Sequence, residues 1–467
     1  MVPTGTGSWL RGTPAEPAPT WRRRRADPRR PALGDFCEQV TRIPQTSGDD
    51  GRVSHDSRRI DDFLEFIDAS PSPYHAATEA QARLHSAGFG PLTTLSDGPI
   101  PARGSIRSGG MMIAWNVASA GGSWRIIGAH TDSPNLRIKP HPDLGGSGMR
   151  RLAAEPYGGA LLNSWLDRDL GLSGRVSLSS RPGERPTDVL FRVDGPLLRV
   201  PQLAIHLDRE INERGLLLNK QHHLNPVWGL GDPGEGDFRS WLAGELGVGP
   251  DRILAWDAMC HDVQPAALLG VSRELISAPR LDNLCSCYGA ISALTAADPG
   301  AGNVMIALFD HEEVGSETAT GAASPRLAQV LDALGGYDAA TSRVLSADMA
   351  HGTHPNYPER HEPNHPIRLG GGPVVKVNVN QRYATDAVTA GEFAAICDDV
   401  GVPRQTYSHR SDLACGSTIG PITAARLGVP TVDVGMAQLS MHSSRELMAA
   451  ADVDHMVTAF AAWLAEA

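Results

Sequence analysis

Apolar residues along this chain follow two kinds of spacing. Between residues 60 and 70 they recur at i, i+3, i+4 and i+7, the spacing of one face of an amphipathic helix. A second helix is expected to start at Ser72-Pro73, an N-cap followed by Pro at the first helical position, and to stop at Gly88. Order is therefore expected to begin near Ile60.

Short, unbroken apolar runs predict buried strands farther along the chain. These runs lie at 123–129, 304–309, 344–347, 374–379 and 431–434. Helical patterns lie between most of them, at 284–297, 325–334 and 392–400. Strands that alternate with helices are typical of an α/β fold, in which helices cover both faces of a sheet.

Residues 136–250 have a different pattern. This stretch is rich in Gly, Pro and Arg, and its short β-like runs, at 174–178 and 188–193, are joined by few long helical patterns. We interpret it as a β-rich domain inserted into the α/β domain. The α/β domain would then comprise residues 53–135 and 251–467.

Charged residues are unevenly distributed along the chain. The 467 residues carry −11, but the first 30 hold seven Arg against one Asp and one Glu, so the rest carries −16 from 35 cations and 51 anions. An acidic body argues against a nucleic-acid-binding enzyme, because phosphate neutralisation needs clustered cations. Residues 1–52, without helical or strand period, are expected to form a disordered tail without a function of its own. A nucleic-acid- or membrane-binding role of its Arg cluster is the alternative.

Other composition features exclude further classes. Only three of the 42 basic residues are Lys, and none stands in the Gly-Lys-Ser/Thr of a phosphate loop. No apolar run approaches the roughly 20 residues of a membrane span, and the first residues lack the apolar region of a secretory signal. The six cysteines have no zinc-ribbon spacing. We therefore expect a cytoplasmic protein with free thiols and no membrane or nucleic-acid partner.

Polar residues gather where the predicted strands end or a helix begins. In α/β sheets, functional groups collect at the carboxyl ends of strands. Acidic side chains directly after strongly apolar strands are poorly explained by packing. The clusters are His130-Thr131-Asp132, Asp282-Asn283, Asp310-His311-Glu312-Glu313, Asp348 and His442-Ser443.

Two imidazoles with three or four carboxylates match the needs of a pair of Zn²⁺ ions, where one Asp bridges and each metal gains a carboxylate and a His. In Glu312-Glu313, one carboxylate can bind metal while its neighbour takes a proton from the bridging water. In His130-x-Asp132, the Asp can hold the other nitrogen of a ligand His. The sequence lacks H-E-x-x-H, the dinucleotide G-x-G-x-x-G and the nucleophile G-x-S-x-G.

Long strings in these regions resemble the aspartyl aminopeptidase family of dinuclear zinc exopeptidases. The resemblance covers residues 60–467 in one consistent order. The strings are SPSPYHA at 70–76, GAHTDSPNLRIKP at 128–140, EPYGGALLNSWLDRDLGLSGRV at 155–176, VPQLAIHLDREIN at 200–212, APRLDNLCSCYGA at 278–290, FDHEEVGSET at 309–318, SADMAHGTHPNYPERHEPNHP at 346–366, GGPVVKVNVNQRYATD at 371–386 and QLSMHSSREL at 438–447.

The resemblance implies a fold and a division of roles. The fold would be a mixed sheet flanked by helices, the co-catalytic zinc exopeptidase fold, with an inserted β-rich dimerisation domain. Glu312 would be the general base, and Asp132 would orient His130. One metal would be held by His130 and Asp348, the other by Glu313 and His442, with Asp282 as the bridge.

The resemblance also raises a question about His206, which the family pattern contains and which is a further candidate metal ligand. Because five residues already complete a dinuclear site, we prefer a substrate-side role in which His206 reaches the site of a neighbouring subunit. A structural His in an interface is the alternative. The His run at 351–365 is expected to shape the loop over the substrate, with His351 as a substrate-binding candidate.

The family prefers an N-terminal Asp or Glu, whose side chain needs a cation. Lys376 lies in the alternating run VVKVNVN and should face away from its β-branched neighbours, toward a cleft or solvent. It is our candidate for the acidic-side-chain anchor, with a solvated strand Lys as the alternative. Tyr383 and Arg382 are weaker candidates.

The expected activity is hydrolysis of the first peptide bond of short peptides with a free N-terminal Asp or Glu. Two Zn²⁺ per subunit are expected, although His and carboxylate ligands also admit Mn²⁺ or Co²⁺. The family implies a homo-oligomer of dimers, commonly a dodecamer. The alternatives are a dinuclear deacylase or carboxypeptidase on the same core, and an oligomeric binding protein that uses the Arg-rich tail.

Overall fold

The helices and strands predicted from the apolar pattern are present in the computed structural model. The structure describes residues 57–96, 98–181, 183–300 and 302–466, so the expected tail at 1–52 and Cys37 lie outside the described residues. Gly88 adopts φ +89°, which only glycine tolerates easily, and ends the second helix as expected.

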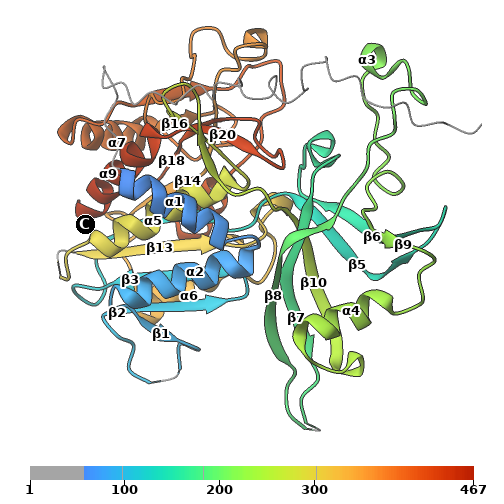
Figure 1. Ribbon diagram of the computed structural model, residues 1–467. Helices are drawn as coiled ribbons and strands as arrows, with labels where there is room; N and C mark the ends of the chain where they lie inside the picture. Colours follow the sequence, from blue (N-terminus) through green and yellow to red (C-terminus); the bar gives the residue numbers. More distant parts are fainter. Residues whose placement is uncertain (1–56, 97, 182, 301, 467) are drawn as a thin grey trace, which may run out of the picture. The chain divides into compact units, whose positions relative to one another are not determined.

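The largest sheet is mixed and has nine strands (Figure 1). Its order is β1 (Gly90–Leu92), β2 (Arg103–Ser108), β3 (Met111–Asn116), β13 (Asn303–Phe309), β4 (Trp124–His130), β14 (Arg343–Ala347), β18 (Thr431–Gly435), β16 (Val374–Val377) and β17 (Gln405–Ser408). Strands β13, β4, β14 and β18 run parallel at its centre, whereas β3 and β16 run against β13 and β18.

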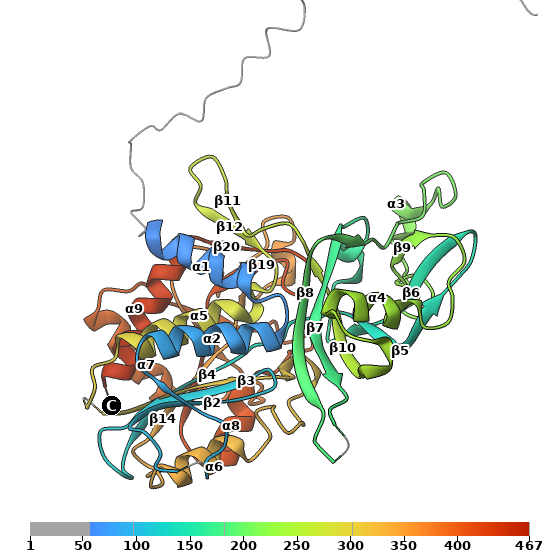
Figure 2. The same cartoon turned by 60° about the horizontal axis from the view of Figure 1, so that its bottom comes forward.

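Helices cover both faces of this sheet (Figure 2). One face packs against α1 (Ser57–Ala69), α2 (Pro73–Ser86), α5 (Leu281–Ala296), α7 (Ala387–Asp399) and α9 (Ala451–Ala465). The other face packs against α6 (Arg326–Ala333) and α8 (Ile419–Leu427). Ile127 and Ile306 enter the first core and Ile126 and Met305 the second, because successive side chains of a strand point to opposite faces. Burial on both sides explains why these strands are unbroken apolar runs.

A second sheet of six antiparallel strands occupies most of the stretch that the sequence marks as β-rich. Its order is β8 (Thr187–Leu198), β7 (Leu170–Leu178), β10 (Ile253–Asp262), β5 (Asn135–Leu144), β6 (Met149–Tyr157) and β9 (Val227–Leu230). Helix α4 (Asp237–Leu246) packs Phe238 and Leu242 into a separate core with Trp165, and α3 (Ile211–Arg214) is a single turn. The domain boundaries themselves remain a prediction.

A third sheet of five short strands joins segments that are distant in sequence. Its order is β11 (Ala267–Leu269), β12 (Leu275–Ala278), β20 (Glu446–Ala449), β19 (Ala437–Leu439) and β15 (Ala350–His351). The segment before α5 and the segment between β19 and β20 thus lie side by side. Across the described ranges, none of the helices has the length and apolar character that a bilayer crossing requires.

Candidate active site

Three parallel strands deliver polar residues to one edge of the nine-stranded sheet. His130 is the last residue of β4 and stands in register with Phe309, the last residue of β13. Glu312 and Glu313 follow β13 in a short 3-10 turn, and Asp348 follows β14. The carboxyl ends of parallel strands meet at one edge, so residues more than 200 positions apart come together.

Asp282 and His442 reach the same place by other routes. Asp282 lies at the start of α5, where its φ of −81° and ψ of 105° depart from helical values. His442 lies in the turn between β19 and β20 with φ +65°. The six residues singled out at strand ends and helix starts are therefore brought into one cluster.

The first half of the cluster surrounds the His130 imidazole, which is 1% exposed. Its Nε2 lies 3.4 Å from Asp282 Oδ1 and 3.4 Å from Asp348 Oδ1. Glu312 Oε2 is farther away, at 3.9 Å. His130 Nε2 and these carboxylate oxygens face one another, but within the described chain no regular hydrogen bond joins them.

The second half surrounds His442. Its Nε2 lies 3.5 Å from Asp282 Oδ2 and 3.3 Å from Glu313 Oε1. Asp282 therefore presents one carboxylate oxygen to each histidine. Single ligand atoms of His130, Asp282 and Glu313 also lie within 4.8 Å of one another, so the two halves are contiguous.

The donor set fits divalent zinc. Asp282 Oδ1 and Glu313 Oε1 are buried, and neither accepts a hydrogen bond from the part of the chain that is described. In a tetrahedral zinc site with bonds of about 2.0–2.1 Å, neighbouring ligand atoms stand roughly 3.3–3.4 Å apart. The 3.3–3.5 Å separations of His130 and His442 from their carboxylates match that spacing. Burying unpaired carboxylates is costly, and a bound cation removes that cost.

Asp132 contacts three residues of the cluster and holds them in position. His130 Nδ1 lies 3.0 Å from the Asp132 carbonyl oxygen and 3.4 Å from its Oδ1, which favours the tautomer that leaves Nε2 free as a ligand. The same carboxylate accepts hydrogen bonds from the backbone amides of Glu312 at 3.0 Å and Glu313 at 3.1 Å. Asp132 thus holds both the expected general base and a ligand in place.

Electrostatics reflect the crowding of negative charge. Burial, with the nearby charges of Asp348 and Asp132, raises the pKa of Glu312 to about 8 against the opposing effect of His130. Burial also raises the pKa of Glu313. Burial lowers the pKa of His442, but hydrogen bonding to Asp282 and the charge of Glu313 outweigh it and raise that pKa to about 10. The cluster attracts positive charge, as a metal site requires.

Most of the sequence matches a known family. The family model described as aminopeptidase I zinc metalloprotease (M18) matches residues 66–464. The chain belongs to the M18 family of zinc metalloaminopeptidases. This membership confirms the resemblance at the level of the family and makes the protein a hydrolase that removes N-terminal residues from peptides. It also selects aminopeptidase activity over the deacylase, carboxypeptidase and binding-protein alternatives.

Two similar relatives are both named "Probable M18 family aminopeptidase 2". The one from Mycobacterium leprae (strain TN) is 51% identical over 407 residues, which cover 84% of this chain and 95% of that protein. The one from Streptomyces coelicolor is 48% identical over 428 residues, which cover 88% of this chain and 98% of that protein.

Solved structures of M18 enzymes share the fold. The Ape4 chain in a complex with Nbr1 has a TM-score of 0.83 and 34% identity, over 87% of this chain and 85% of that one. An Ape1 chain from a dodecamer of S. cerevesiae mApe1 has a TM-score of 0.74 and 26% identity, over 86% of this chain and 95% of that one. An M18 enzyme of Thermotoga maritima, at 22% identity and TM-score 0.75, agrees in fold. The expected α/β fold with a mixed, helix-flanked sheet and a β-rich part is confirmed.

In this M18 chain, a cavity of about 300 Å³ opens beside the cluster. Asp282, Glu312, Asp348 and His442 form one wall. The remaining lining includes His351, Lys376, Tyr383, Tyr407, Met441 and the segments 159–161 and 416–418. A substrate bound in this cavity would contact the carboxylates and the candidate substrate-binding residues together.

Lys376 faces the cluster from β16. Its side chain is buried, and Nζ donates hydrogen bonds to the carbonyl oxygens of Asp348 at 2.8 Å and Met349 at 3.2 Å. Nζ also lies 3.4 Å from Asp348 Oδ2 and 5.2 Å from the centre of the Tyr383 ring. Lys376 is thus not a solvated strand residue, and it supports the Asp348 backbone as well as lining the cavity.

The other candidates lie in two different places. His351 and Tyr383 line the cavity, and both rings pack near Tyr407. His206 lies on the exposed loop after β8, and no contact of the described chain joins it to the cluster. Its role stays a prediction, because a neighbouring subunit would have to bring it to the site.

Sequence reasoning missed two residues that contact the cluster or Asp132 behind it. The Tyr157 hydroxyl, from β6, donates a hydrogen bond to Asp132 Oδ2 at 2.7 Å. Glu446, the first residue of β20, accepts hydrogen bonds from the backbone of two cluster residues. Both stand inside the family strings EPYGG and SSREL, but neither follows a predicted strand, so the strand-end rule could not mark them.

Proposed function

We propose that this M18 aminopeptidase uses two zinc ions per chain and prefers peptides that begin with Asp or Glu. The observation that carries the proposal is the position of Asp282, whose two carboxylate oxygens lie 3.4 Å and 3.5 Å from the Nε2 atoms of two different histidines. A carboxylate in that position suits a bridge. His130 and Asp348 would complete one metal site, and Glu313 and His442 the other.

Zinc bound there would lower the pKa of the attacking water toward about 7 and polarise the substrate carbonyl. Glu312 would take the proton of that water and pass it to the leaving amine. Its carboxylate suits this role because it lines the cavity and stands farther from His130 than the two ligand carboxylates do. The Asp132 carboxylate would hold Glu312 in place by accepting a hydrogen bond from the Glu312 backbone amide.

Lys376 supports the preference for acidic side chains. Among the residues that line the cavity, it is the only Lys or Arg, and Asp282, Glu312, Asp348 and His442 line the same cavity. Two of its three N–H groups bond carbonyl oxygens and the third bonds Asp348 Oδ2 at the longer distance of 3.4 Å, so a substrate carboxylate would compete with Asp348 for that third N–H. A substrate carboxylate near Nζ would gain a charge-assisted hydrogen bond.

The test is a panel of aminoacyl-p-nitroanilides with Asp, Glu, Leu and Ala, assayed on the wild type and on two Lys variants. Lys376→Met should lower kcat/KM for Asp and Glu substrates by roughly 10- to 100-fold relative to Leu, the value of a charged hydrogen bond. Lys139→Met is the matched control, because Lys139 also lies in a strand but bonds only Gln221 at the surface.

Equal wild-type rates on Asp and Leu substrates would contradict the acidic preference. A Lys376→Met protein that retained the wild-type ratio would leave the preference standing and remove Lys376 as its source. Mn²⁺ or Co²⁺ in the metal analysis of the purified protein would replace zinc as the physiological ion without changing the roles of the residues.

The active form in this proposal is a cytoplasmic homo-oligomer built from dimers, and a dodecamer is expected. The loop that carries His206 supports a subunit contact, because it exposes three large apolar side chains, Leu203, Ile205 and Leu207, and Leu217 is exposed just after α3. A contact through this loop would bring His206 toward a partner's site. Light scattering of the purified protein tests the assembly, and a monomer with full activity would contradict it.

A further inference from the structure

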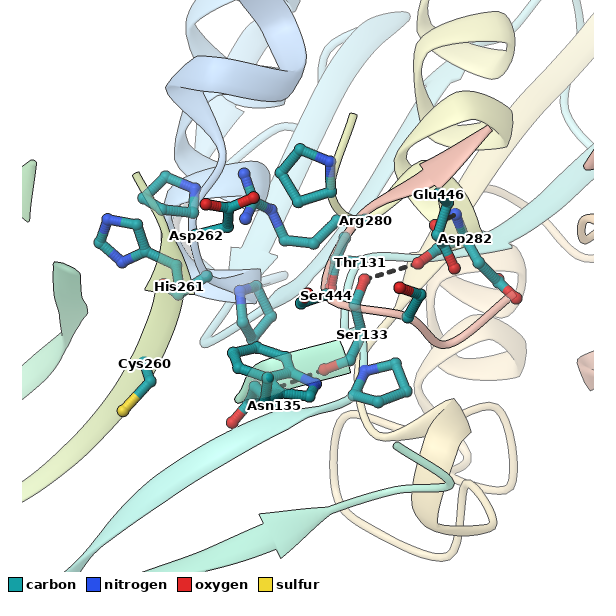
Figure 3. A pocket seen from close by; sticks show the side chains of 17 residues that line it. Thr131, Ser133, Asn135, Cys260, His261, Asp262, Arg280, Asp282, Ser444 and Glu446 are labelled. Carbon is teal, nitrogen blue, oxygen red and sulfur yellow. Dashed lines mark hydrogen bonds between the residues drawn. The ribbon is translucent and has the colours of Figure 1, made fainter. Parts of the chain in front are cut away.

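Glu446 is a buried carboxylate directly beside Asp282 (Figure 3). Its Oε2 accepts a hydrogen bond from the backbone amide of Asp282 at 3.0 Å. Its Oε1 accepts one from the backbone amide of His442 at 2.6 Å. One side chain thus joins two cluster residues that are 160 positions apart in the sequence.

The carboxylate is itself held firmly. Glu446 begins β20 and pairs with Ala278 of β12, four residues before Asp282. The adjacent Arg445 donates hydrogen bonds to the carbonyl oxygens of Ser277 at 2.8 Å and Pro265 at 2.6 Å. Strands β12 and β20 therefore form a fixed base from which the Glu446 side chain reaches both residues.

The two backbone amides need this partner. Asp282 has non-helical angles at the start of α5, and His442 has φ +65° in a turn, so neither amide enters a regular ladder. An unsatisfied buried N–H costs about 1–3 kcal/mol. A single carboxylate satisfies both amides only when one amide faces each of its two oxygens. This requirement fixes the distance between Asp282 and His442.

We propose that Glu446 is a positioning residue that sets the distance between Asp282 and His442. This inference rests on the proposed metal centre, in which those two residues hold one ion together. Asp132 offers a parallel within the same site, because its carboxylate holds the amides of Glu312 and Glu313. Two buried carboxylates would then each align one pair of functional residues through the backbone.

The test uses Glu446→Gln, which keeps the side-chain shape but can accept only one of the two amide hydrogen bonds. Its matched control is Asp452→Asn, because Asp452 is also fully buried and accepts the backbone amides of Gly370 at 2.8 Å and Gly372 at 2.9 Å. Zinc affinity is measured by competition with a chromophoric chelator, and the ligand field by the visible absorption of the cobalt(II)-loaded proteins. Thermal unfolding of the metal-free proteins monitors folding.

Glu446→Gln should bind at least one zinc ion roughly 10- to 100-fold more weakly and should shift the cobalt(II) absorption bands, as for other residues that orient ligands. Asp452→Asn should lower the unfolding temperature but keep the wild-type zinc affinity and spectrum. If Glu446→Gln does not fold, Glu446→Asp carries the test, because its shorter side chain cannot reach both amides and should give the same changes.

Wild-type zinc affinity and an unchanged spectrum in a folded Glu446 variant would overturn the inference. The same changes in Asp452→Asn would also overturn it, because they would reflect a general loss of stability. The wild type is titrated first. Fewer than two zinc ions per wild-type chain would contradict the proposed metal centre itself, whereas two ions with an unaffected Glu446→Gln would contradict only the role of Glu446.

Discussion

The two larger sheets use the same residue types in different surroundings. In the nine-stranded sheet, every residue of β13 is buried, and the acidic residues that follow β13 and β14 stand at a buried edge. In the six-stranded sheet, β8 exposes most of its residues and only Phe191 and Leu198 are buried. A carboxylate at the edge of the first sheet is therefore placed to take part in chemistry, whereas a carboxylate on β8 is solvated at the surface.

Two matched pairs make this contrast concrete. Glu312 lines the cavity and has a raised pKa, whereas Glu155 is exposed on β6. Lys376 is buried and bonded to main-chain oxygens near the cluster, whereas Lys139 reaches only the Gln221 side chain. For the same residue type, burial and neighbours determine what each side chain can do.

The largest expected effect is on turnover. Glu312→Gln should lower kcat by roughly 10²- to 10⁴-fold, the contribution of a general base, because the amide cannot accept the proton. Zinc content should be unchanged, because Glu312 is not among the proposed ligands. Steady-state hydrolysis of Asp-p-nitroanilide measures the loss.

Glu155→Gln is the control for that variant and should retain wild-type kcat. A Glu312→Gln enzyme with normal turnover would show that another residue is the base. Reduced zinc content in Glu312→Gln would instead assign Glu312 to the ligands.

Packing should differ between the two sheets by a smaller amount. Leu308→Ala in β13 empties a fully buried position and should lower the free energy of unfolding by about 2–5 kcal/mol. Leu190→Ala in β8 removes a side chain that is 36% exposed and should cost less than about 1 kcal/mol. Urea unfolding of the two variants measures both. Equal losses would mean that β8 is covered in solution, as a subunit interface would do.

The smallest expected effect is a pH dependence where the two regions meet. Burial, together with Arg192 of β8 and Arg280, lowers the pKa of His75 on α2 to about 4. The unfolded chain, with a His pKa near 6.5, binds the proton more tightly, so this contribution to stability is complete above pH 6.5 and is lost as the pH falls toward 4.

His75→Gln should remove part of that loss. Between pH 7 and pH 5, the wild type should lose roughly 2 kcal/mol more stability than the variant. Thermal unfolding at the two pH values measures the difference. A variant as acid-sensitive as the wild type would place the titrating groups elsewhere.

The sequence predicted the central strands and their helices well, because strands buried on both faces leave unbroken apolar runs. The runs before His130, Asp310 and Asp348 all became parallel strands of one sheet. Their common direction brought the polar residues that follow them together. The expectation that functional groups collect at the carboxyl ends of strands therefore identified the cluster. The chemistry of that edge followed from residue type and position.

The remaining features depend on contacts that no local pattern records. Glu446 became part of the site because β20 pairs with β12, a register that no periodicity specifies. Tyr157 reaches Asp132 from the other sheet. The alternation around Lys376 indicated its direction but not its bonds to the Asp348 and Met349 carbonyl oxygens. Whether His206 reaches a site depends on a second chain.

The central claim is that Asp282 is shared by two metal ions. The most direct test is the zinc content per chain, measured by mass spectrometry of the elements after metal-free protein is loaded with zinc and dialysed. The account predicts two zinc ions per wild-type chain. A saturating content of one ion or none would contradict it.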